Sequence, residues 1–267
     1  MKRYFMKTIH VGIERYKEWN ELVAQEPFFA LQQSWQWGDF KEKFGWKAYR
    51  IGVEEHGRIM AGAQMLIRFL PMKLGSIAYI PRGPIGEWLD EEIASHLFPG
   101  LHHYARNSRA IFLKIEPSRI NNRSVYQMLQ QYKFRVSSIM NQVQASIIID
   151  LKPELDQILA QMHQKTRYNI RYAAKKGIAV RTGTREDLGT FENLMRALGK
   201  QAGFASRGLE YFEHEWDTFA SLGQLRFFVA TYQGKTLAIH LMGMFGEHAA
   251  YLHGASSNEH KNLMPNY

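Results

Sequence analysis

The sequence predicts an α/β protein made of two tandem domains, each with a mixed central sheet flanked by helices. Three observations lead to this prediction. Segments typical of strands and of helices alternate along the chain, an order that places helices against a sheet. A strand, a turn and a second strand recur in the two halves. The length of 267 residues, 45% of them hydrophobic, suits two domains of ordinary size.

The first half contains a clear succession of elements. Residues 8–13 predict a short strand, and Glu14 to Gln25 predict an amphipathic helix that Pro27 ends. The aromatic-rich segment 32–46 is interpreted mainly as core. The elements expected after it are strands 48–54 and 57–71, a strand 76–81 that runs into a Pro/Gly turn with Arg82 at its lip, a helix 88–107, a buried strand 110–117, a helix 124–132 and a strand 144–151.

The repeated pattern is a strand, a glycine turn and a longer strand, in residues 50–67 and again in residues 226–245. The alignment pairs Arg50 with Arg226 and needs one inserted residue before Gly234. Glycine turns between strands are common, so a chance hairpin is one interpretation. Two copies of one α/β domain are the other, and they fit the length.

The domain boundary is expected near Ile149 to Pro153, where a strand ends and the proline opens the next helix. The domains are therefore residues 1–149 and 150–267. The elements expected in the second domain are helices 154–162 and 165–176, a strand 178–183, a helix 185–202, the repeated hairpin, a further strand and a helix that begins near Pro265. The chain stops there, so the second domain is expected to be incomplete.

Composition narrows the classes of partner. The net charge of +9 and the isoelectric point near 9.6 favour polyanions such as RNA, nucleotide-linked substrates or an anionic membrane face. The absence of cysteine excludes disulfides, thiolate zinc sites and cysteine nucleophiles. No apolar run of about 18 residues and no signal-peptide core occur, which predicts a soluble, cytoplasmic protein.

The most basic segment is residues 162–178. No acid occurs between Asp156 and Glu186. On a helix, Arg167 and Arg171 would share one face, with two tyrosines on an adjacent one. Two interpretations remain open at this point: a solvated basic helix, or a phosphate-binding surface, because guanidinium groups match phosphate oxygens.

The usual chemical motifs are absent. The sequence contains no GxxxxGK[ST] loop, no GxGxxG turn and no HExxH motif, so neither a cofactor nor a metal site is expected. Glu116, at a strand end, is a candidate base, substrate ligand or solvated acid. His253 and Ser256 lie where a strand turns into the expected last helix, whose N-terminus would either point into a cleft or be capped by serine.

Five segments together resemble the FemABX family of peptidoglycan bridge-forming aminoacyltransferases. They are QSWQWGDFKEKFGW, YIPRGPIG, FLKIEP, KTRYNIRYAAKKGIAV and YLHGASSNEHKNLMPNY. The resemblance implies two domains like the GCN5-related acetyltransferase (GNAT) fold. It also implies transfer of an amino acid from aminoacyl-tRNA to an amine on the stem peptide of UDP-linked or lipid-linked muramyl pentapeptide, without DNA as a partner. Both substrates are polyanions, and the lipid-linked form implies peripheral contact with the inner membrane face.

The resemblance also assigns candidate residues. Lys41 resembles the lysine that contacts the pyrophosphate of the precursor, and Arg167 or Arg171 resembles its arginine partner. The other candidates are Arg82, Lys114 and Glu116 along the precursor groove, and Tyr251, His253 and Ser256 facing the end of the charged tRNA. The family typically continues past MPNY with an FKxxF-like segment implicated in catalysis, so the catalytic residues are expected outside this chain. Some members carry a helical hairpin in the second domain that this chain lacks.

Two other functions compete with this one. An acyl-CoA-dependent N-acyltransferase of the GNAT class would need an [RQ]xxGx[GA] turn before a helix, and the closest match is residues 58–63, on a predicted strand. A non-catalytic fragment that binds RNA or the precursor would explain the charge without chemistry.

Overall fold

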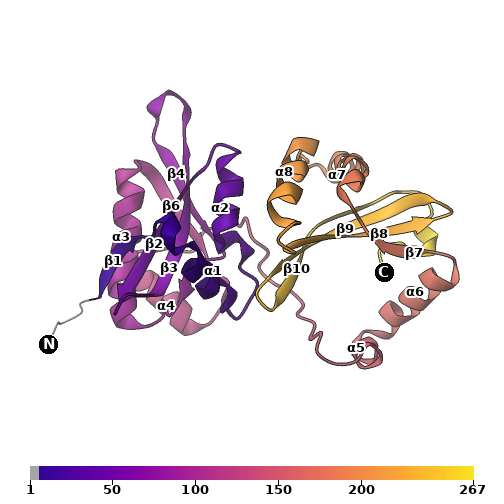
Figure 1. The fold of residues 1–267 in the computed structure, drawn as a ribbon, viewed down its shortest axis with the longest axis horizontal. Helices are drawn as coiled ribbons and strands as arrows, with labels where there is room; N and C mark the ends of the chain where they lie inside the picture. Colours follow the sequence, from indigo (N-terminus) through magenta and orange to yellow (C-terminus); the bar gives the residue numbers. More distant parts are fainter. Residues whose placement is uncertain (1–5) are drawn as a thin grey trace. The chain divides into compact units, whose positions relative to one another are not determined.

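The computed structural model describes residues 6–267, and the chain forms two compact units, each a sheet flanked by helices (Figure 1). Unit 1 comprises the residues up to Gln144 together with Phe245–His248, and unit 2 comprises Ala145–Met244 with Ala249–Tyr267. The mixed α/β architecture predicted from the sequence is confirmed. No helix within residues 6–267 has both the length and the apolar character needed to cross a membrane.

Unit 1 is built on a sheet with the strand order β1-β2-β3-β4-β6, and the short β5 pairs with β3. The strands are β1 (Lys7–His10), β2 (Lys47–Glu55), β3 (Arg58–Phe69), β4 (Ser76–Pro81), β5 (Ile85–Gly86) and β6 (Ala110–Glu116). The helices are α1 (Tyr16–Ala24), α2 (Trp35–Glu42), α3 (Glu91–Asn107) and α4 (Arg123–Gln131), and a 3-10 turn, η2 (Leu31–Gln33), precedes α2. Side chains of Ser34, Asp90 and Asn122 cap the starts of α2, α3 and α4.

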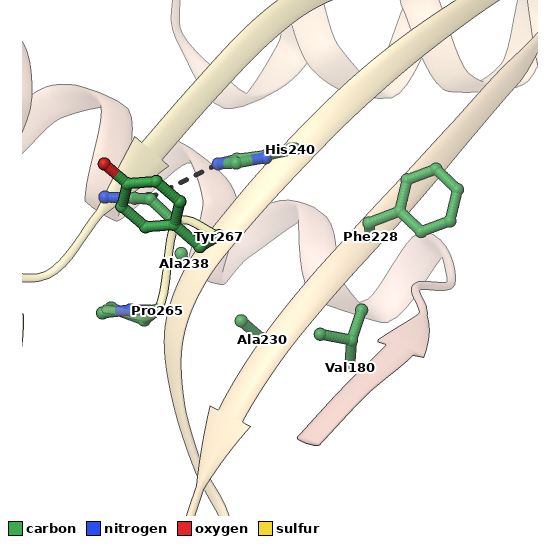
Figure 2. Close-up of a pocket in the computed structure, with 8 residues that line it drawn as sticks. Val180, Phe228, Ala230, Ala238, His240, Pro265 and Tyr267 are labelled. Carbon is green, nitrogen blue, oxygen red and sulfur yellow. Dashed lines mark hydrogen bonds between the residues drawn. The ribbon is translucent and has the colours of Figure 1, made fainter. Parts of the chain in front are cut away.

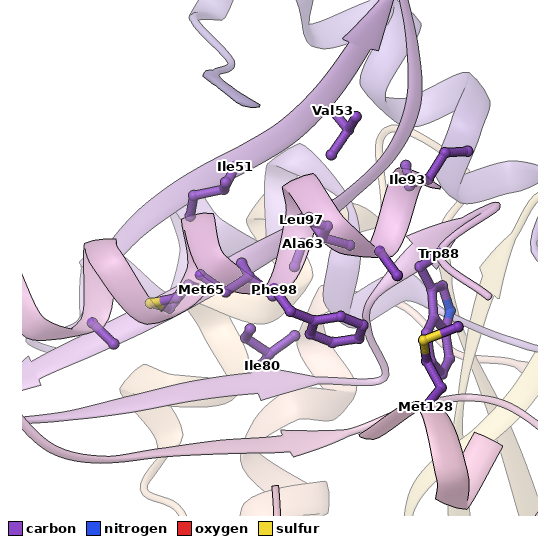
Figure 3. Packing of buried hydrophobic residues seen from close by; sticks show 14 of the residues in the cluster. Ile51, Val53, Ala63, Met65, Ile80, Trp88, Ile93, Leu97, Phe98 and Met128 are labelled. Atoms are coloured by element: carbon purple, nitrogen blue, oxygen red, sulfur yellow. The ribbon is translucent and has the colours of Figure 1, made fainter. Parts of the chain in front are cut away.

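Alternate residues of β3 face opposite layers of unit 1, as the pleat of a strand requires. Ala63 and Met65 lie in the core cluster that also contains Phe98 of α3 (Figure 3). Gly62 faces the other way, toward α1, where an added Cβ would lie 2.7 Å from Trp19. The sheet is therefore covered on both faces.

The face of β3 opposite α3 carries a buried polar network. Gln33 and Gln64 are both fully buried, and the backbone N–H of Gln64 donates to Oε1 of Gln33 at 2.7 Å. The Gln33 amide in turn donates to the carbonyl of Pro81 at 2.7 Å. Arg50, the cross-strand partner of Gln64, donates to the Trp35 carbonyl at 2.7 Å and stacks on the Trp35 ring. The network thus ties η2 and α2 to β3 and to the end of β4.

Two predictions for the edge of unit 1 are wrong. The sequence predicts a buried strand at 110–117, but β6 is the edge of the sheet, and Ile111 is 65% exposed. The sequence also predicts a strand at 144–151, yet these residues have no regular structure and Ile147 is 92% exposed. The isoleucines there favour extended backbone, but a strand also needs a hydrogen-bonded neighbour, and the segment has none within residues 6–267.

Unit 2 is built on a sheet with the order β10-β9-β8-β7, in which β7, β8 and β9 pair antiparallel. Its strands are β7 (Ala179–Thr182), β8 (Leu225–Tyr232), β9 (Lys235–Phe245) and β10 (His248–Ser256), and its helices are α5 (Leu155–Gln161), α6 (Gln164–Lys175), α7 (Leu188–Ala202) and α8 (Leu209–Phe219). Phe191, Phe212 and Phe227 join α7 and α8 to one face of the sheet. After β10 the described residues form turns and a 3-10 turn, Lys261–Leu263, and the helix expected to begin near Pro265 stays a prediction.

The hairpin β8–β9 repeats β2–β3, but without the inserted residue that the sequence alignment requires. The pairs next to each bulge, Val53 with Ala61 and Ala230 with Ala238, lie at the same distance from the turn glycines. Val53 therefore corresponds to Ala230, not to the neighbouring valine. The two residues of each turn have positive φ, as a two-residue hairpin turn with right-handed twist requires.

We predict that Gly38→Ala destabilises unit 1 by about 2 kcal/mol, because overfilling a packed site typically costs this much. The added Cβ would lie 2.4 Å from both Nη2 of Arg50 and Oε1 of Gln64, whose positions the buried network fixes. Urea unfolding followed by tryptophan fluorescence measures the effect. Gly189→Ala, in α7 with open space around the new Cβ, is the control and should be neutral or slightly stabilising. An unchanged midpoint of urea unfolding for Gly38→Ala would contradict the prediction, because it would show that the side chains of Arg50 and Gln64 can move aside without loss of stability.

Candidate functional site

The parallel strands β4 and β6 place candidate side chains at one edge of the unit 1 sheet. Their C-terminal ends meet, with Pro81 paired with Glu116. Arg82 follows β4 in the left-handed region, with a φ of 54°, which turns the chain sharply at this point. Lys114 and Glu116 belong to the end of β6. The structure therefore brings together Arg82, Lys114 and Glu116, three of the residues selected from the sequence.

Glu116 is the centre of this group. Its carboxylate accepts a hydrogen bond from the hydroxyl of Tyr79, and Nζ of Lys114 lies 3.4 Å from its Oε1. Gln142 completes the ring of contacts: its Nε2 donates to the Tyr79 hydroxyl at 2.9 Å, and its Oε1 accepts from Nε of Arg82 at 3.1 Å. We call these five residues the carboxylate cluster.

The protonation states in the carboxylate cluster follow from burial and neighbours. Burial opposes ionisation of Glu116, but hydrogen bonds from Tyr79 and from the N–H of Asn141, together with the charge of Lys114, outweigh it, so the pKa of Glu116 lies below its usual value. Burial, reinforced by the hydrogen bond to Glu116, raises the pKa of Tyr79 well above its usual value. Burial lowers the pKa of Arg82. The cluster thus holds a stable negative charge beside a protonated phenol, which suits binding of a ligand better than abstraction of a proton.

Lys41 lies on the last turn of α2, which begins at the Ser34 cap. Its Nζ is 5.8 Å from the ring centre of Trp37 and 5.6 Å from that of Phe40, so aromatic faces hold the charged end of the side chain. Lys43, at the end of the same helix, is exposed. The neighbouring side chains of Trp35 and Phe40 are buried, as the aromatic density of this segment predicts.

The structure distinguishes Arg167 from Arg171, the two candidates for the phosphate-binding arginine. Nη1 of Arg167 donates to the carbonyl of Ala160 at 3.1 Å and also to that of Met162, so it satisfies free carbonyls at the end of α5. Arg171 is exposed, and its side chain has no ion-pair or hydrogen-bond partner in the described part of the chain. Of the two, Arg171 is the one available to an anionic ligand.

The three candidates on β10 do not form one constellation. Tyr251 is 57% exposed and lies edge-on to His240, with ring centres 5.3 Å apart. His253 instead approaches α8, where its Nε2 lies 3.7 Å from the buried carboxylate of Glu215. The Ser256 hydroxyl accepts a hydrogen bond from Asn266, which belongs to the last residues of the chain. Each side chain therefore has a different environment.

Several residues of these environments were missed from the sequence. Tyr79 belongs to a strand in which buried and partly buried residues alternate, and Gln142 lies in a segment without periodicity. Neither pattern marks the residue as part of a functional site. Glu215 lies on α8, a helix that the segment GLEYFEHEW could have revealed by its amphipathic spacing. The same helix brings Tyr211 under Arg207, whose guanidinium carbon is 5.1 Å from the centre of the tyrosine ring.

A shallow apolar pocket of about 190 Å³ lies on the face of the unit 2 sheet opposite Phe227 (Figure 2). It is lined by Val180, Phe228, Ala230, Ala238, His240, Pro265, Asn266 and Tyr267. His240 and Asn266, joined by a hydrogen bond of 3.4 Å, are its main polar groups. Within residues 6–267, no group of three or more His, Asp or Glu side chains is placed to hold a metal ion.

Two α/β units built around the same hairpin define a tandem GNAT-like protein, and comparison with solved structures agrees with this class. The crystal structure of FemX has a TM-score of 0.83 and 22% sequence identity, with coverage of 97% of this chain and 83% of that one. A tandem GNAT protein from the clavulanic acid biosynthesis pathway has a TM-score of 0.56 and 12% identity, over 97% of this chain and 81% of that one. The predicted fold is thereby confirmed.

The family follows from the sequence comparison. The family model described as the FemAB family matches residues 15–131 and 130–238, so the chain belongs to the FemAB family. A lipid II:glycine glycyltransferase of Staphylococcus epidermidis is 26% identical over 222 residues, covering 80% of this chain and 53% of the relative. A lipid II:glycine glycyltransferase of Staphylococcus aureus is 27% identical over 239 residues, covering 86% of this chain and 56% of the relative. The chain thus spans about half the length of the curated relatives it matches.

We predict that Glu116→Gln destabilises unit 1 by about 2 kcal/mol at neutral pH, because charge-assisted hydrogen bonds are lost. The folded state lowers the pKa of Glu116, so its contribution is fully present above the unfolded value of about 4.3 and is lost as the pH falls through the folded value. The difference between variant and wild type should therefore shrink as the pH falls below about 4.3 and through the lower folded-state pKa. Urea unfolding across this range measures it, with the exposed Glu87→Gln as control. A difference that stays constant with pH would contradict the proposed ionisation.

Proposed function

We propose that this chain is the substrate-binding core of an aminoacyltransferase that moves an amino acid from aminoacyl-tRNA to an amine on the stem peptide of a peptidoglycan precursor. Membership of the FemAB family carries this proposal, and the relatives named lipid II:glycine glycyltransferases support it. The same relatives favour the lipid-linked precursor as acceptor and glycine as the transferred residue. The UDP-linked precursor has the same pyrophosphate and stem peptide, so it serves as the soluble probe of the same site.

The acceptor is assigned to unit 1. Its phosphates need cations, and its stem peptide carries the amine that reacts. Lys41 is proposed to bind the pyrophosphate, with its charged end held by the aromatic faces of α2. Arg82 and Lys114 supply further positive charge around Glu116, whose lowered pKa keeps a carboxylate available for an ammonium group or a peptide N–H. The carboxylate cluster would thus position the stem peptide.

The donor is assigned to unit 2. Tyr251, His253 and Ser256 on β10 are proposed to lie along the path of the aminoacyl end, and Arg171 of α6 provides a separate phosphate contact. In the reaction, the neutral amine attacks the ester carbonyl carbon, a C–N bond forms, and the C–O bond to the ribose breaks. The proton of the amine ends on the released ribose hydroxyl. Because the ester is already activated, correct positioning can supply most of the acceleration, and no covalent enzyme intermediate is needed.

The acyl-CoA alternative receives no support from the local structure. The closest match to a CoA-binding turn, residues 58–63, lies within β3 and leads into no helix. Its backbone groups are paired with β2, so they cannot form a loop that cradles a pyrophosphate. Consumption of acetyl-CoA by the intact chain would nevertheless reverse this conclusion.

We predict that the chain binds UDP-linked muramyl pentapeptide and that Lys41→Ala weakens binding about tenfold or more. The loss of one charge-assisted phosphate contact costs about 1.5–3 kcal/mol, which corresponds to this factor. Isothermal titration calorimetry measures both affinities.

Lys43→Ala is the matched control, because it removes the same charge from an exposed position at the end of the same helix. It should change the affinity by less than about twofold, as expected of a charge in open solvent. Absence of binding by the wild type, or equal losses for Lys41→Ala and Lys43→Ala, would contradict the assignment of the acceptor to this part of unit 1.

A further inference from the structure

Cations and two tyrosines dominate one side of α6. With about 3.6 residues per turn, Lys165, Tyr168, Arg171, Tyr172 and Lys175 fall within an arc of about 120° around the helix. All but Tyr172, which is half-buried, are exposed, and the side chains of Lys165, Arg171 and Lys175 have no ion-pair or hydrogen-bond partner in the part of the chain that the structure describes. We call these five residues, with Lys176 at the helix end, the α6 surface.

The tyrosines order this surface. The rings of Tyr168 and Tyr172 are stacked with centres 5.7 Å apart and planes inclined by 23°, and Nζ of Lys176 lies 5.5 Å from the centre of the Tyr172 ring. Tyr168 is nevertheless 62% exposed, so its ring and hydroxyl remain open to a partner. A solvated charged face needs no such aromatic pair. Stacked rings between cations are instead typical of surfaces that bind nucleic acid.

The opposite side of α6 explains why this surface is unsuited to lipid. Ala173 belongs to a core cluster with Ala230 and Ala238 of the sheet, and Asn169 is 3% exposed. A helix that lies in a membrane interface must bury an apolar face in the lipid. In α6 that face is already used inside unit 2. The exposed side chains of the helix are those of Lys165, Tyr168, Arg171 and Lys175, with Gln164 and Ala174, so they offer no large aliphatic group to lipid.

The length of the α6 surface distinguishes between two phosphate ligands. From Lys165 to Lys176 the helix rises about 16 Å, at about 1.5 Å per residue. A pyrophosphate would fit within a single helical turn and would leave most of these cations unused. Each strand of a DNA duplex carries about one phosphate per 3.4 Å of axis, and an RNA duplex is slightly denser, so one strand presents at least about five phosphates over the same length.

From this match of length, charge and exposed phenol groups, we infer that the α6 surface binds the backbone of a double-stranded RNA arm of the aminoacyl-tRNA. The inference rests on the proposed function, which supplies an RNA substrate, and it assigns that substrate to a particular helix. Lys165, Arg171 and Lys175 contact successive phosphates, and the tyrosine hydroxyls donate to phosphate or ribose oxygens. Arg167 holds the helix against the end of α5 and does not take part.

The test uses the full chain and a fluorescently labelled RNA hairpin with an acceptor-stem duplex and a CCA end. The triple variant Lys165→Ala, Arg171→Ala, Lys175→Ala should bind it at least tenfold more weakly at about 100 mM salt. The slope of log affinity against log salt concentration should fall by about 2 to 3, because each phosphate contact contributes about 0.9. Anisotropy titrations at several salt concentrations measure both quantities.

The matched control removes the same charge from exposed helical positions elsewhere, with Lys17→Ala, Arg106→Ala and Lys200→Ala. It should keep most of the affinity and the slope. The charge-preserving variant Lys165→Arg, Arg171→Lys, Lys175→Arg should also bind RNA, which separates loss of contact from loss of fold. Equal losses for the α6 triple variant and the control would mean that only bulk charge matters, and the inference would fail.

Two further measurements separate the alternatives. Vesicles containing an anionic phospholipid should bind the wild type and the α6 triple variant alike; loss of vesicle binding in that variant, with RNA binding intact, would assign the surface to a membrane instead. The α6 triple variant should still bind UDP-linked muramyl pentapeptide, because the acceptor is assigned to unit 1. Loss of that binding would instead make Arg171 the partner of Lys41 at the pyrophosphate and would defeat the inference. A wild type that binds the precursor but not the RNA defeats this inference alone, whereas a wild type that binds neither defeats the proposed function as well.

Discussion

The buried pairing of Gln64 with Gln33, and of Arg50 with Trp35, is the constraint on which the candidate acceptor site depends. Amide and guanidinium groups in a dry interior are tolerated only where hydrogen bonds compensate their desolvation. Here those bonds join β3, the segment before α2 and the carbonyl of Pro81. As a result, the helix that carries Lys41 and the turn that carries Arg82 are both fixed to one sheet.

The second unit uses the same hairpin for a different purpose. By the observed register, Arg50 and Gln64 of unit 1 correspond to Phe227 and Leu241 of unit 2, and each pair consists of cross-strand partners. Phe227 and Leu241 are buried, and Phe227 packs against Phe191 of α7. One copy thus carries a polar network that holds a loop and a helix, whereas the other carries an ordinary apolar core. This difference agrees with a division of labour in which each unit binds a different substrate.

The charges of the two candidate surfaces are organised in opposite ways. In the carboxylate cluster, cations surround an ionised Glu116, and hydrogen bonds fix the orientation of each group. On the α6 surface, the lysines and the arginine form no ion pair with any acid among residues 6–267. The first arrangement suits recognition of defined groups on a small ligand. The second suits a long polyanion, because its phosphates are equally spaced and the same cations can bind it at several positions along its backbone.

The sequence by itself determined the α/β class, most helices and strands, the repeated hairpin and the family, because periodicity, turn glycines and dense aromatic motifs are local signals. It also placed Arg82, Lys114 and Glu116 at strand ends. Only the tertiary structure decided that these three meet, because the parallel pairing of β4 and β6 joins segments about 35 residues apart. The same holds for the difference between Arg167 and Arg171, for the exposed edge at β6 and for the unpaired isoleucines after Gln144. Each depends on which neighbour occupies the space beside a residue, and local sequence does not encode that neighbour.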